Sequence, residues 1–356
     1  DRCLMDYVHQ NQNEFPFSTV EDIPYFDDDV ISLFSSKDAL KLNGDDTDKL
    51  ASGTIGVPEF GTQFVRSMLE TIKPNSVSQI IKVSGLSHGT DVWMKNAEDL
   101  VKGVNPKYPK IMFNDVIGCR DDIMIYLISM GVDSALSFTI MESVRKGKGL
   151  KPEWEEAMTA QGVPDWYIAS CKKIKYMFPK AHAAAYVMMA WRIAYCKINY
   201  PQAYYASYFS IRASAFSYEI MCQGQKHLED VMKDYKSRSD SLSKKEQDTL
   251  KDMKIVQEMY ARGFEFEPID IFRAHSRNFQ IFDGKIMPSL SSIDGLGEKA
   301  ADAIVEAAKD GPFLSKDDFR MRTKASKTII DLMSDLGILG DLPESNQISL
   351  FDFALS

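Results

Sequence analysis

The sequence predicts a mainly α-helical protein with one short β-hairpin. Apolar residues recur at helical spacing from Val116 to about Tyr208, with breaks at the "GKG" of residues 147–149 and at the "GVPDW" of residues 162–166. A charged pair of helices, solvated on the outside, is expected over residues 225–262. A later stretch, "FRAHSRNFQIFDGKIMPSLSSI", alternates in polarity around an Asp-Gly pair, which is typical of a tight hairpin turn.

The beginning of the chain is polar and acidic. Residues 1–53 are expected to form loops with one short helix between them. Within this region Asp27, Asp28 and Asp29 are consecutive, and they predict a solvated turn or a helix N-terminus, where negative charge is favourable. A cluster of carboxylates that binds a metal ion is the alternative.

A helix with a regular apolar stripe is expected next. Phe64, Met68 and Ile72 recur every four residues, and Pro74 ends the helix. The glycine- and serine-rich stretch "SGLSHGTDVW" that follows is expected to be a loop.

Composition limits the classes of function. The 356 residues suffice for about two or three domains, and 44% hydrophobic content is ordinary for a globular protein. No apolar run reaches the roughly twenty residues of a membrane span, and no signal peptide is present, so no membrane partner is expected. The start at Asp1 suggests a piece of a longer protein. Five scattered cysteines without C-x-x-C spacing argue against a zinc site and disulfides, and they fit a reducing cytoplasm.

The net charge of −9 is unevenly distributed. Residues 1–60 hold 13 Asp and Glu against 4 Lys and Arg, whereas residues 141–200 hold 10 Lys and Arg against 5 Asp and Glu. A local excess of positive charge is typical of a surface that binds phosphate. The acidic total therefore does not exclude a nucleic-acid or nucleotide partner.

The basic middle contains two motifs. "ESVRKGKG" places Arg145, Lys146 and Lys148 beside two glycines, without the spacing of a Walker motif. "CKKIKYMFPKAHAAAYV" adds four lysines and sets His182 and Tyr186 on one helix face. Cations beside a ring-bearing face would suit a nucleoside triphosphate. Taken singly, the lysines would be expected to lie on a solvated face, and His182 would be expected to have a structural role.

The sequence "SSIDGLGEKAADAIVEAA" has the pattern of a helix–hairpin–helix. Gly295 and Gly297 would let the hairpin backbone approach a DNA phosphate, and the amides that begin the next helix would point at it. Such contacts do not depend on base sequence. A helix–turn–helix packing unit is the alternative. The following "SKTIIDLMSDLGILGDL" resembles a degenerate second copy and is expected to serve packing.

The end of the chain, "NQISLFDF", pairs an aliphatic with an aromatic residue. Gln347 is followed by Leu350 and Phe351, which form a suitable anchor for a hydrophobic pocket on a partner. The pattern resembles the peptide by which proteins bind a bacterial sliding clamp. A tail folded back on the core is the alternative.

Together these motifs resemble the C-terminal quarter of the bacterial replicative DNA polymerase III alpha subunit of the PolC type, a C-family DNA polymerase of low-GC Gram-positive bacteria. The resemblance covers most of residues 50–351 in order, through "TIGVPEFGTQFVR", "SGLSHGTDVW", "VIGCRDDIM", "IMESVRKGKGL", "CKKIKYMFPKAHAAAYV" and "NQISLF". It implies a helical fingers region followed by tandem helix–hairpin–helix units. The implied segments are an acidic leader at the end of the palm or its connection to the fingers (1–55), fingers (56–215), a charged helical connector (216–262), a helix–hairpin–helix DNA-binding region (263–345) and a clamp-binding tail (346–356).

The resemblance also implies partners and site residues. Template–primer DNA, an incoming dNTP, the sliding clamp (beta subunit) and other replisome subunits are the expected partners, in the cytoplasm at the nucleoid. The residues expected to border the triphosphate, the template and the nascent base pair are Ser87, His88, Arg120, Arg145, Lys146, Lys148, Lys175, Tyr176, Lys180, His182 and Tyr186. The residues expected at the DNA backbone are Gly295, Leu296, Gly297 and Lys299, and those expected at the clamp are Gln347, Leu350 and Phe351.

The sequence departs from the family in one respect that matters for mechanism. The palm carboxylates that hold two metal ions during nucleotidyl transfer are absent, so no catalytic residue and no metal ligand is expected here. Mg²⁺ would bind elsewhere in the full polymerase, no zinc is expected, and the chain alone should bind without polymerising.

Two rival functions follow from the same motifs. A non-catalytic adaptor would bind DNA and the clamp without a nucleotide site. A helix–hairpin–helix DNA glycosylase would need a catalytic residue such as Asp317 or Asp318 in a base-flipping pocket, but these two residues read as a helix start.

Overall fold

The computed structural model describes residues 2–11, 15–42 and 52–345. By its internal contacts the chain forms two compact units. The first unit comprises Asp1–Phe17, Leu42–Leu50 and Asn199–Ser356, and the second comprises Ser18–Lys41 and Ala51–Ile198. The described residues form helices and one two-stranded sheet, so the mainly α-helical fold is confirmed. Within them, no helix has both the length and the apolar character that crossing a membrane requires.

The regular secondary structure in the described part of the second unit is all helical. Its elements are η1 (Val20–Asp22), α2 (Asp28–Leu33), η2 (Asp38–Leu40), α3 (Gln63–Ile72), α4 (Val77–His88), η4 (Trp93–Ala97), α5 (Glu98–Lys102), α6 (Arg120–Ser129), α7 (Ser134–Arg145), α8 (Pro152–Ala160), α9 (Asp165–Lys173) and nearly all of α10 (Lys180–Asn199). The predicted breaks at residues 147–149 and 162–166 separate α7, α8 and α9, as expected.

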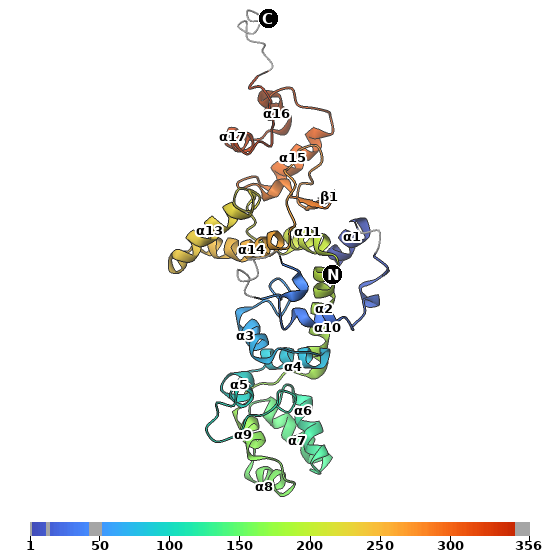
Figure 1. The fold of residues 1–356 in the computed structure, drawn as a ribbon, viewed down its shortest axis with the longest axis vertical. Coiled ribbons are helices and arrows are strands. Elements are labelled where there is room, and N and C mark those ends of the chain that lie inside the picture. Colours follow the sequence, from blue (N-terminus) through green and yellow to red (C-terminus); the bar gives the residue numbers. More distant parts are fainter. Residues whose placement is uncertain (1, 12–14, 43–51, 346–356) are drawn as a thin grey trace, which may run out of the picture. The chain divides into compact units, whose positions relative to one another are not determined.

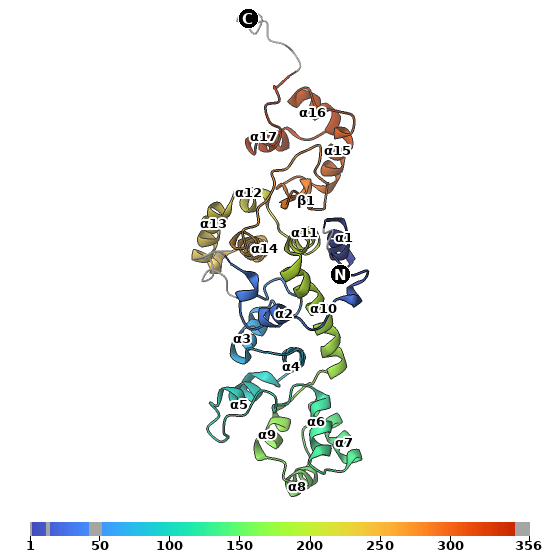
Figure 2. The same cartoon turned by 45° about the vertical axis from the view of Figure 1, so that its right-hand side comes forward.

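The long helix α10 organises the second unit. The fully buried Trp191 donates its indole N–H to the carbonyl of Pro24 at 2.7 Å. The equally buried ammonium of Lys197 donates to the carbonyls of Gly53 at 2.8 Å and Ile55 at 2.6 Å, which replace the water that a buried charge has lost. Figures 1 and 2 both show α10 running past α2. These contacts fix the position of the side chains at its N-terminal end.

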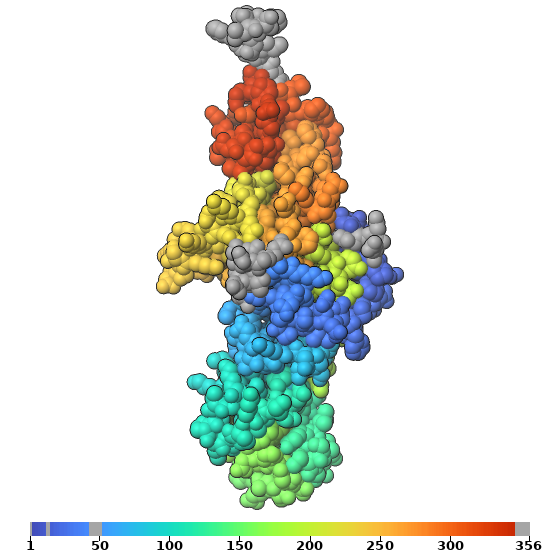
Figure 3. Space-filling model, viewed as in Figure 1, coloured from blue at the N-terminus to red at the C-terminus, as the bar shows by residue number. Residues whose placement is uncertain are grey.

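Helices α5 to α9 gather at the end of this unit that carries the start of α10 (Figure 1), and Figure 3 shows their side chains in continuous contact on the face in view. Helices α6 and α7 pack against each other, and each buries apolar side chains: Ile123 and Leu127 on α6, Ile140 and Val144 on α7. This packing follows from the apolar spacing that predicted the helices.

Two segments expected to be loops are helices instead. Arg2–Asn11 forms α1, which buries Leu4 and Val8, although the surrounding sequence is polar. Residues 84–88 of "SGLSH" belong to α4, so the predicted loop is wrong over these positions. Glycine and serine weaken a helix, but here Gly85 allows close packing, because a Cβ at this position would lie 2.7 Å from the carbonyl oxygen of Gly118.

The predicted apolar stripe of α3 is only partly the buried face. The helix begins after Thr62, whose side chain accepts the N–H of Val65, and it ends at Ile72 before Pro74. Met68 is in the core as expected, whereas Phe64 is 41% exposed. The buried face is centred one position further along the helix than the stripe suggested.

The aspartates at residues 27–29 begin a helix. Asp27 caps α2 by accepting the N–H of Val30 at 3.0 Å, and Asp28 and Asp29 lie in its first turn. Across residues 2–11, 15–42 and 52–345 no group of three His, Cys, Asp or Glu side chains could hold a metal ion. The five cysteines are free thiols, and burial raises the pKa of Cys119 and Cys196 to about 12.

The first unit contains the remaining elements. They are α1 (Arg2–Asn11), α11 (Pro201–Ile211), α12 (Tyr218–Met221), α13 (Gln225–Ser237), η5 (Ser239–Ser241), α14 (Lys244–Ala261), β1 (Gln280–Phe282), β2 (Lys285–Met287), η6 (Leu290–Ser292), α15 (Glu298–Ala308), α16 (Lys316–Thr323) and α17 (Lys327–Asp335). Strands β1 and β2 pair antiparallel across Asp283 and Gly284, both with positive φ, which confirms the predicted hairpin.

The charged helical pair is present as α13 and α14, but α14 is not solvated along its length. From Asp252 onward it is largely buried, and the carboxylate of Glu258 accepts the hydroxyl of Tyr205 at 2.7 Å. A second apolar cluster joins α15, α16 and α17 through residues that include Ile304, Phe319 and Met333. The expected packing role of the segment around α17 is therefore confirmed.

Candidate functional site

The extended segment 174–179 is the centre of the candidate site. It joins α9 to α10 and hydrogen-bonds to three other parts of the second unit. Tyr176 accepts the N–H of Thr90 at 2.9 Å, Met177 donates to the carbonyl of Arg145 at 3.2 Å, and Phe178 accepts the N–H of Arg120 at 3.3 Å. The ends of α4 and α7 and the beginning of α6 therefore meet at this segment.

The contact with α7 depends on Gly147. This residue has a φ of 68°, in the left-handed region that favours glycine. A Cβ at this position would lie 3.1 Å from two backbone carbons of Lys175 and would overlap the carbonyl oxygen of that residue. The "GKG" motif thus lets two backbones approach, which is a structural reason for the glycine beside the basic residues.

Four rings form a cluster around the segment. The imidazole of His88 stacks on Phe178, with ring centroids 4.8 Å apart, and on Tyr186, with centroids 5.4 Å apart. His182 meets Phe178 edge-on at 5.7 Å. Tyr186 is 38% exposed and Tyr176 is 45% exposed, so part of the aromatic surface faces outward. Such pairs are worth about 0.5–1.5 kcal/mol beyond burial, which is enough to hold the rings in place.

His88 is oriented by a residue that sequence reasoning missed. Its Nε2 lies 3.0 Å from Oε2 of Glu59, and its Nδ1 lies 2.7 Å from the carbonyl oxygen of Ser84 and 3.1 Å from the hydroxyl of Ser87. Glu59 has a φ of 68°, which is uncommon for a residue other than glycine and occurs often at functional sites. Glu59 and His88 are 29 residues apart, and no local pattern links them.

The cations of the site fall into two groups. The Arg145 guanidinium and the Lys146 ammonium both bind Glu142, at 2.7 Å and 2.9 Å. These hydrogen bonds, that of Arg145 first, hold the pKa of Glu142 at about 2. In the described part of the chain, Lys148 and Lys175 are exposed and have no ion-pair partner. Helical spacing of three and four residues could have revealed the Glu142 pairs from the sequence.

Lys180 lies at the N-terminal end of α10. Its backbone N–H donates to Oδ2 of Asp121 at 2.8 Å, and its ammonium is 4.0 Å from Oδ1 of Asp122. Its side chain is 51% exposed, so the ammonium can reach an anion in solution.

The structure brings the predicted nucleotide-site residues into one region of the second unit. They come from α4 (Ser87, His88), the start of α6 (Arg120), the end of α7 and its loop (Arg145, Lys146, Lys148), the central segment (Lys175, Tyr176) and α10 (Lys180, His182, Tyr186). Glu59 and Phe178 join them. The arrangement offers cations to phosphates and ring faces to a base or a sugar.

The helix–hairpin–helix residues lie in the first unit. Gly295 has a φ of 82°, and Gly297 precedes α15 with no atom within 4 Å of a Cβ built on it, so the hairpin backbone is open to approach. Lys299 is exposed, whereas Leu296 is buried and packs in the apolar cluster. Leu296 therefore anchors the hairpin and does not face outward as a surface contact would.

The acidic residues of α16 are structural. Ser315 caps the helix, and Asp318 accepts the N–H of Leu314 at 3.0 Å and pairs with Arg322 at 3.5 Å. This agrees with the predicted helix start. The expected clamp residues Gln347, Leu350 and Phe351 lie outside the described residues.

Comparison with known proteins supports the resemblance. Residues 2–164 match the bacterial DNA polymerase III alpha subunit finger domain, and residues 263–348 match a helix–hairpin–helix motif. The chain is 51% identical over 329 residues to the PolC-type DNA polymerase III of Listeria welshimeri and 47% identical over 329 residues to that of Bacillus subtilis. Each alignment covers 92% of this chain and 22% of the relative, so the chain spans about a fifth of the length of these relatives.

Proposed function

This chain belongs to the PolC-type DNA polymerase III family, and on that premise we propose that it binds the incoming deoxynucleoside triphosphate and template–primer DNA for a replicative DNA polymerase. The observation that carries the proposal is the meeting of α4, α6 and α7 at segment 174–179, which sets cations beside an aromatic cluster. The proposed place of action is the nucleoid in the cytoplasm, with other replisome subunits.

The proposed division of labour follows the chemistry of the side chains. Lys148, Lys175 and Lys180 are the exposed cations that meet the triphosphate, whereas Arg145 and Lys146 share their charge with Glu142. The rings of Tyr186 and His88 border the base or the sugar. These contacts bind and orient the nucleotide, which is the larger part of catalysis in phosphoryl transfer.

The metal-dependent part of the reaction is proposed to lie elsewhere. Within the described residues no three side chains suited to a metal ion lie together, so the residues present do not fit the two-metal centre of nucleotidyl transfer. The proposal is that Mg²⁺ ligands come from another part of the polymerase and that this chain alone does not extend primers.

Replacement of Lys180 tests the nucleotide site. In the intact polymerase that contains this chain, Lys180→Ala is expected to raise the apparent KM for dNTP about tenfold, because one charge-assisted contact of about 1.4 kcal/mol is lost, with DNA affinity nearly unchanged. Lys172→Ala is the matched control, since that exposed lysine pairs with Glu155 at 2.9 Å. Weaker DNA binding with a normal KM would reassign Lys180 to the template. No change in either quantity would favour an adaptor without a nucleotide site.

The helix–hairpin–helix match supports DNA binding by the first unit, through contacts of the hairpin backbone and Lys299 with phosphates. Sliding-clamp binding is proposed from the sequence of the tail alone. Fluorescence anisotropy should show roughly micromolar clamp binding, typical of a short peptide, that Leu350→Ala/Phe351→Ala abolishes. Equal binding by the double variant would exclude the tail as the anchor.

A further inference from the structure

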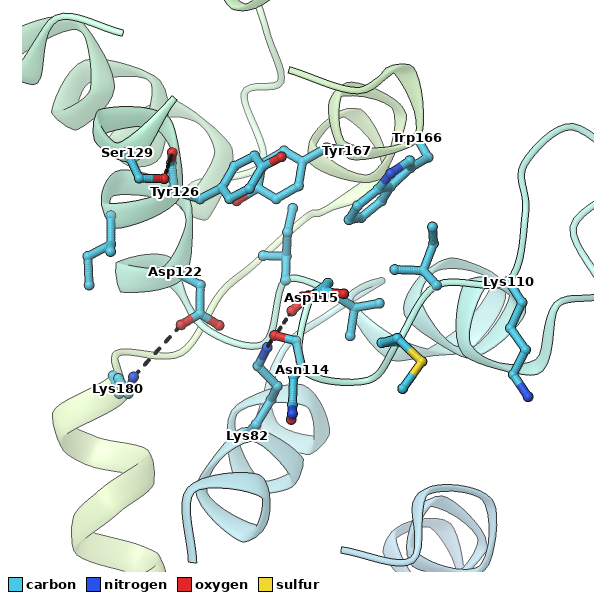
Figure 4. Close-up of a pocket in the computed structure, with 15 residues that line it drawn as sticks. Lys82, Lys110, Asn114, Asp115, Asp122, Tyr126, Ser129, Trp166, Tyr167 and Lys180 are labelled. Atoms are coloured by element: carbon cyan, nitrogen blue, oxygen red, sulfur yellow. Dashed lines mark hydrogen bonds and ion pairs between the residues drawn. The ribbon is translucent and has the colours of Figure 1, made fainter. Parts of the chain in front are cut away.

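A pocket in the second unit lies next to the candidate site and is not explained by it. Its volume is about 610 Å³, within the usual range for ligand pockets. Figure 4 shows the lining side chains, which come from α4, the loop of residues 110–117, α6, the start of α9 and the first residue of α10. Lys180 is the one residue that the pocket shares with the predicted nucleotide-site residues.

One side of the pocket is apolar and aromatic. Ile125 is 57% exposed and Met112 is 70% exposed, although both are large apolar residues beside a hollow. Tyr126 stacks on Tyr167 with centroids 4.2 Å apart, and Trp166 meets Tyr167 edge-on at 5.4 Å. These contacts hold the aromatic wall rigid, so it presents a ready surface to a flat apolar group.

The other side is polar and carries positive charge. The ammonium of Lys82 is anchored on the carbonyls of Asn114 at 2.5 Å and Val116 at 2.8 Å. Lys110 and Lys180 stand at opposite ends of the pocket in Figure 4. The buried hydroxyl of Tyr167, which lines the pocket, has no hydrogen-bond partner in the described part of the chain. A buried polar atom of this kind calls for an explanation, and a ligand would supply one.

We propose that this pocket receives a base of unpaired, single-stranded DNA. The inference rests on the proposed polymerase function but concerns a site separate from the nucleotide site. A base has apolar faces, which suit Trp166 and Ile125, and a polar edge, which can bond to the hydroxyl of Tyr167. A phosphate beside the base would meet Lys110, whereas Lys180 is left to the triphosphate of the proposed nucleotide site.

The sparse positive charge of the pocket favours a strand over other ligands. A triphosphate concentrates its charge and needs clustered cations, whereas a DNA strand carries one charge per nucleotide, which matches the single exposed ammonium of Lys110. Asp115 and Asp122 also line the pocket and would repel a concentrated anion. An apolar side chain of a peptide would leave the hydroxyl of Tyr167 without a partner.

The test uses the intact polymerase with primer–templates that carry 2-aminopurine at successive unpaired template positions. We expect stacking in the pocket to quench the fluorescence at one position. Trp166→Ala should abolish that quenching and weaken binding of the template overhang roughly tenfold, as loss of one stacked base does. Trp166→Phe should retain most of the quenching. Trp154→Ala is the matched control, because Trp154 lies against Lys151 and does not line the pocket.

Four outcomes would overturn the proposal. The pocket would be excluded if the wild-type enzyme extends primers but quenches the 2-aminopurine fluorescence at no template position. It would also be excluded if Trp166→Ala and Trp154→Ala quench that fluorescence equally. If the enzyme quenches free 2-aminopurine triphosphate and Trp166→Ala removes that quenching, the pocket would be assigned to mononucleotides instead.

If Trp166→Ala does not fold, a second variant tests the proposal. Lys110 is exposed, and Lys110→Ala should weaken binding of the overhang and lower the salt dependence of that binding by about one phosphate contact. An unchanged salt dependence would count against the proposal. A wild type that neither binds nor extends primer–template would refute the proposed function itself.

Discussion

A single methyl group at Gly147 should separate the backbone of the central segment from α7. Alanine at this position would place its Cβ against the carbonyl group of Lys175, which is backbone and cannot rotate away as a side chain can. Lys175 in turn donates its N–H to Thr90 at 3.0 Å, and Met177 donates to Arg145 at 3.2 Å. Relief of the clash would disturb these hydrogen bonds and displace the residues of the proposed nucleotide site.

A neighbouring glycine allows the magnitude to be worked out. Gly149 has a φ of 72°, close to the 68° of Gly147, but a Cβ on Gly149 meets nothing within 4 Å. Alanine at either position should cost about 1 kcal/mol for the left-handed backbone. Only Gly147→Ala adds overpacking, which costs about 1–3 kcal/mol. The expected losses of unfolding free energy are therefore about 1 kcal/mol for Gly149→Ala and about 2–4 kcal/mol for Gly147→Ala.

Both variants can be compared in the intact polymerase by denaturant unfolding and by the apparent KM for dNTP. Gly149→Ala should leave KM near normal, whereas Gly147→Ala should raise it, because Lys175 and Tyr176 move with the segment. Equal destabilisation by the two variants would refute the close contact. A strongly destabilised Gly147→Ala enzyme with a normal KM would refute the claim that this segment positions nucleotide contacts.

Two other substitutions test separate parts of the structure. Glu59→Gln weakens the hydrogen bond that orients His88. Because both side chains are partly exposed, we expect a loss of about 1 kcal/mol, which would raise the KM for dNTP roughly fivefold and leave the DNA affinity unchanged. An unaltered KM would show that the imidazole needs no such partner. Burial raises the pKa of Asp252 to about 6, above its unfolded value, so its charge destabilises the fold as pH rises through 6. Measured by urea unfolding, Asp252→Asn should therefore raise the unfolding free energy by about 1–3 kcal/mol at pH 8 and leave it unchanged below pH 4. An equal gain at both pH values would contradict the assignment of the raised pKa to Asp252.

Features that depend on local backbone physics were predictable from the sequence. The helix breaks at residues 147–149 and 162–166, the hairpin at Asp283–Gly284 and the open turn at Gly295 all follow from glycine and proline conformations and from apolar spacing. Most of the basic residues predicted for the candidate site lie in two short motifs, so the sequence could single them out, and their binding roles stay a prediction. Family resemblance joined these motifs to a function, and the comparisons support that family.

The tertiary structure decided which distant residues meet. Glu59 lies 29 residues before His88 in the sequence, and Phe178, which stacks on the same histidine, comes much later in the chain. Residues 84–88 are helical because α4 packs closely on Gly118, against the local preference of glycine and serine. A sequence pattern reports neighbours within a few turns of helix or strand, whereas such contacts depend on how whole helices pack. The contacts of His88 with Glu59, Phe178 and Tyr186 therefore came from the fold alone.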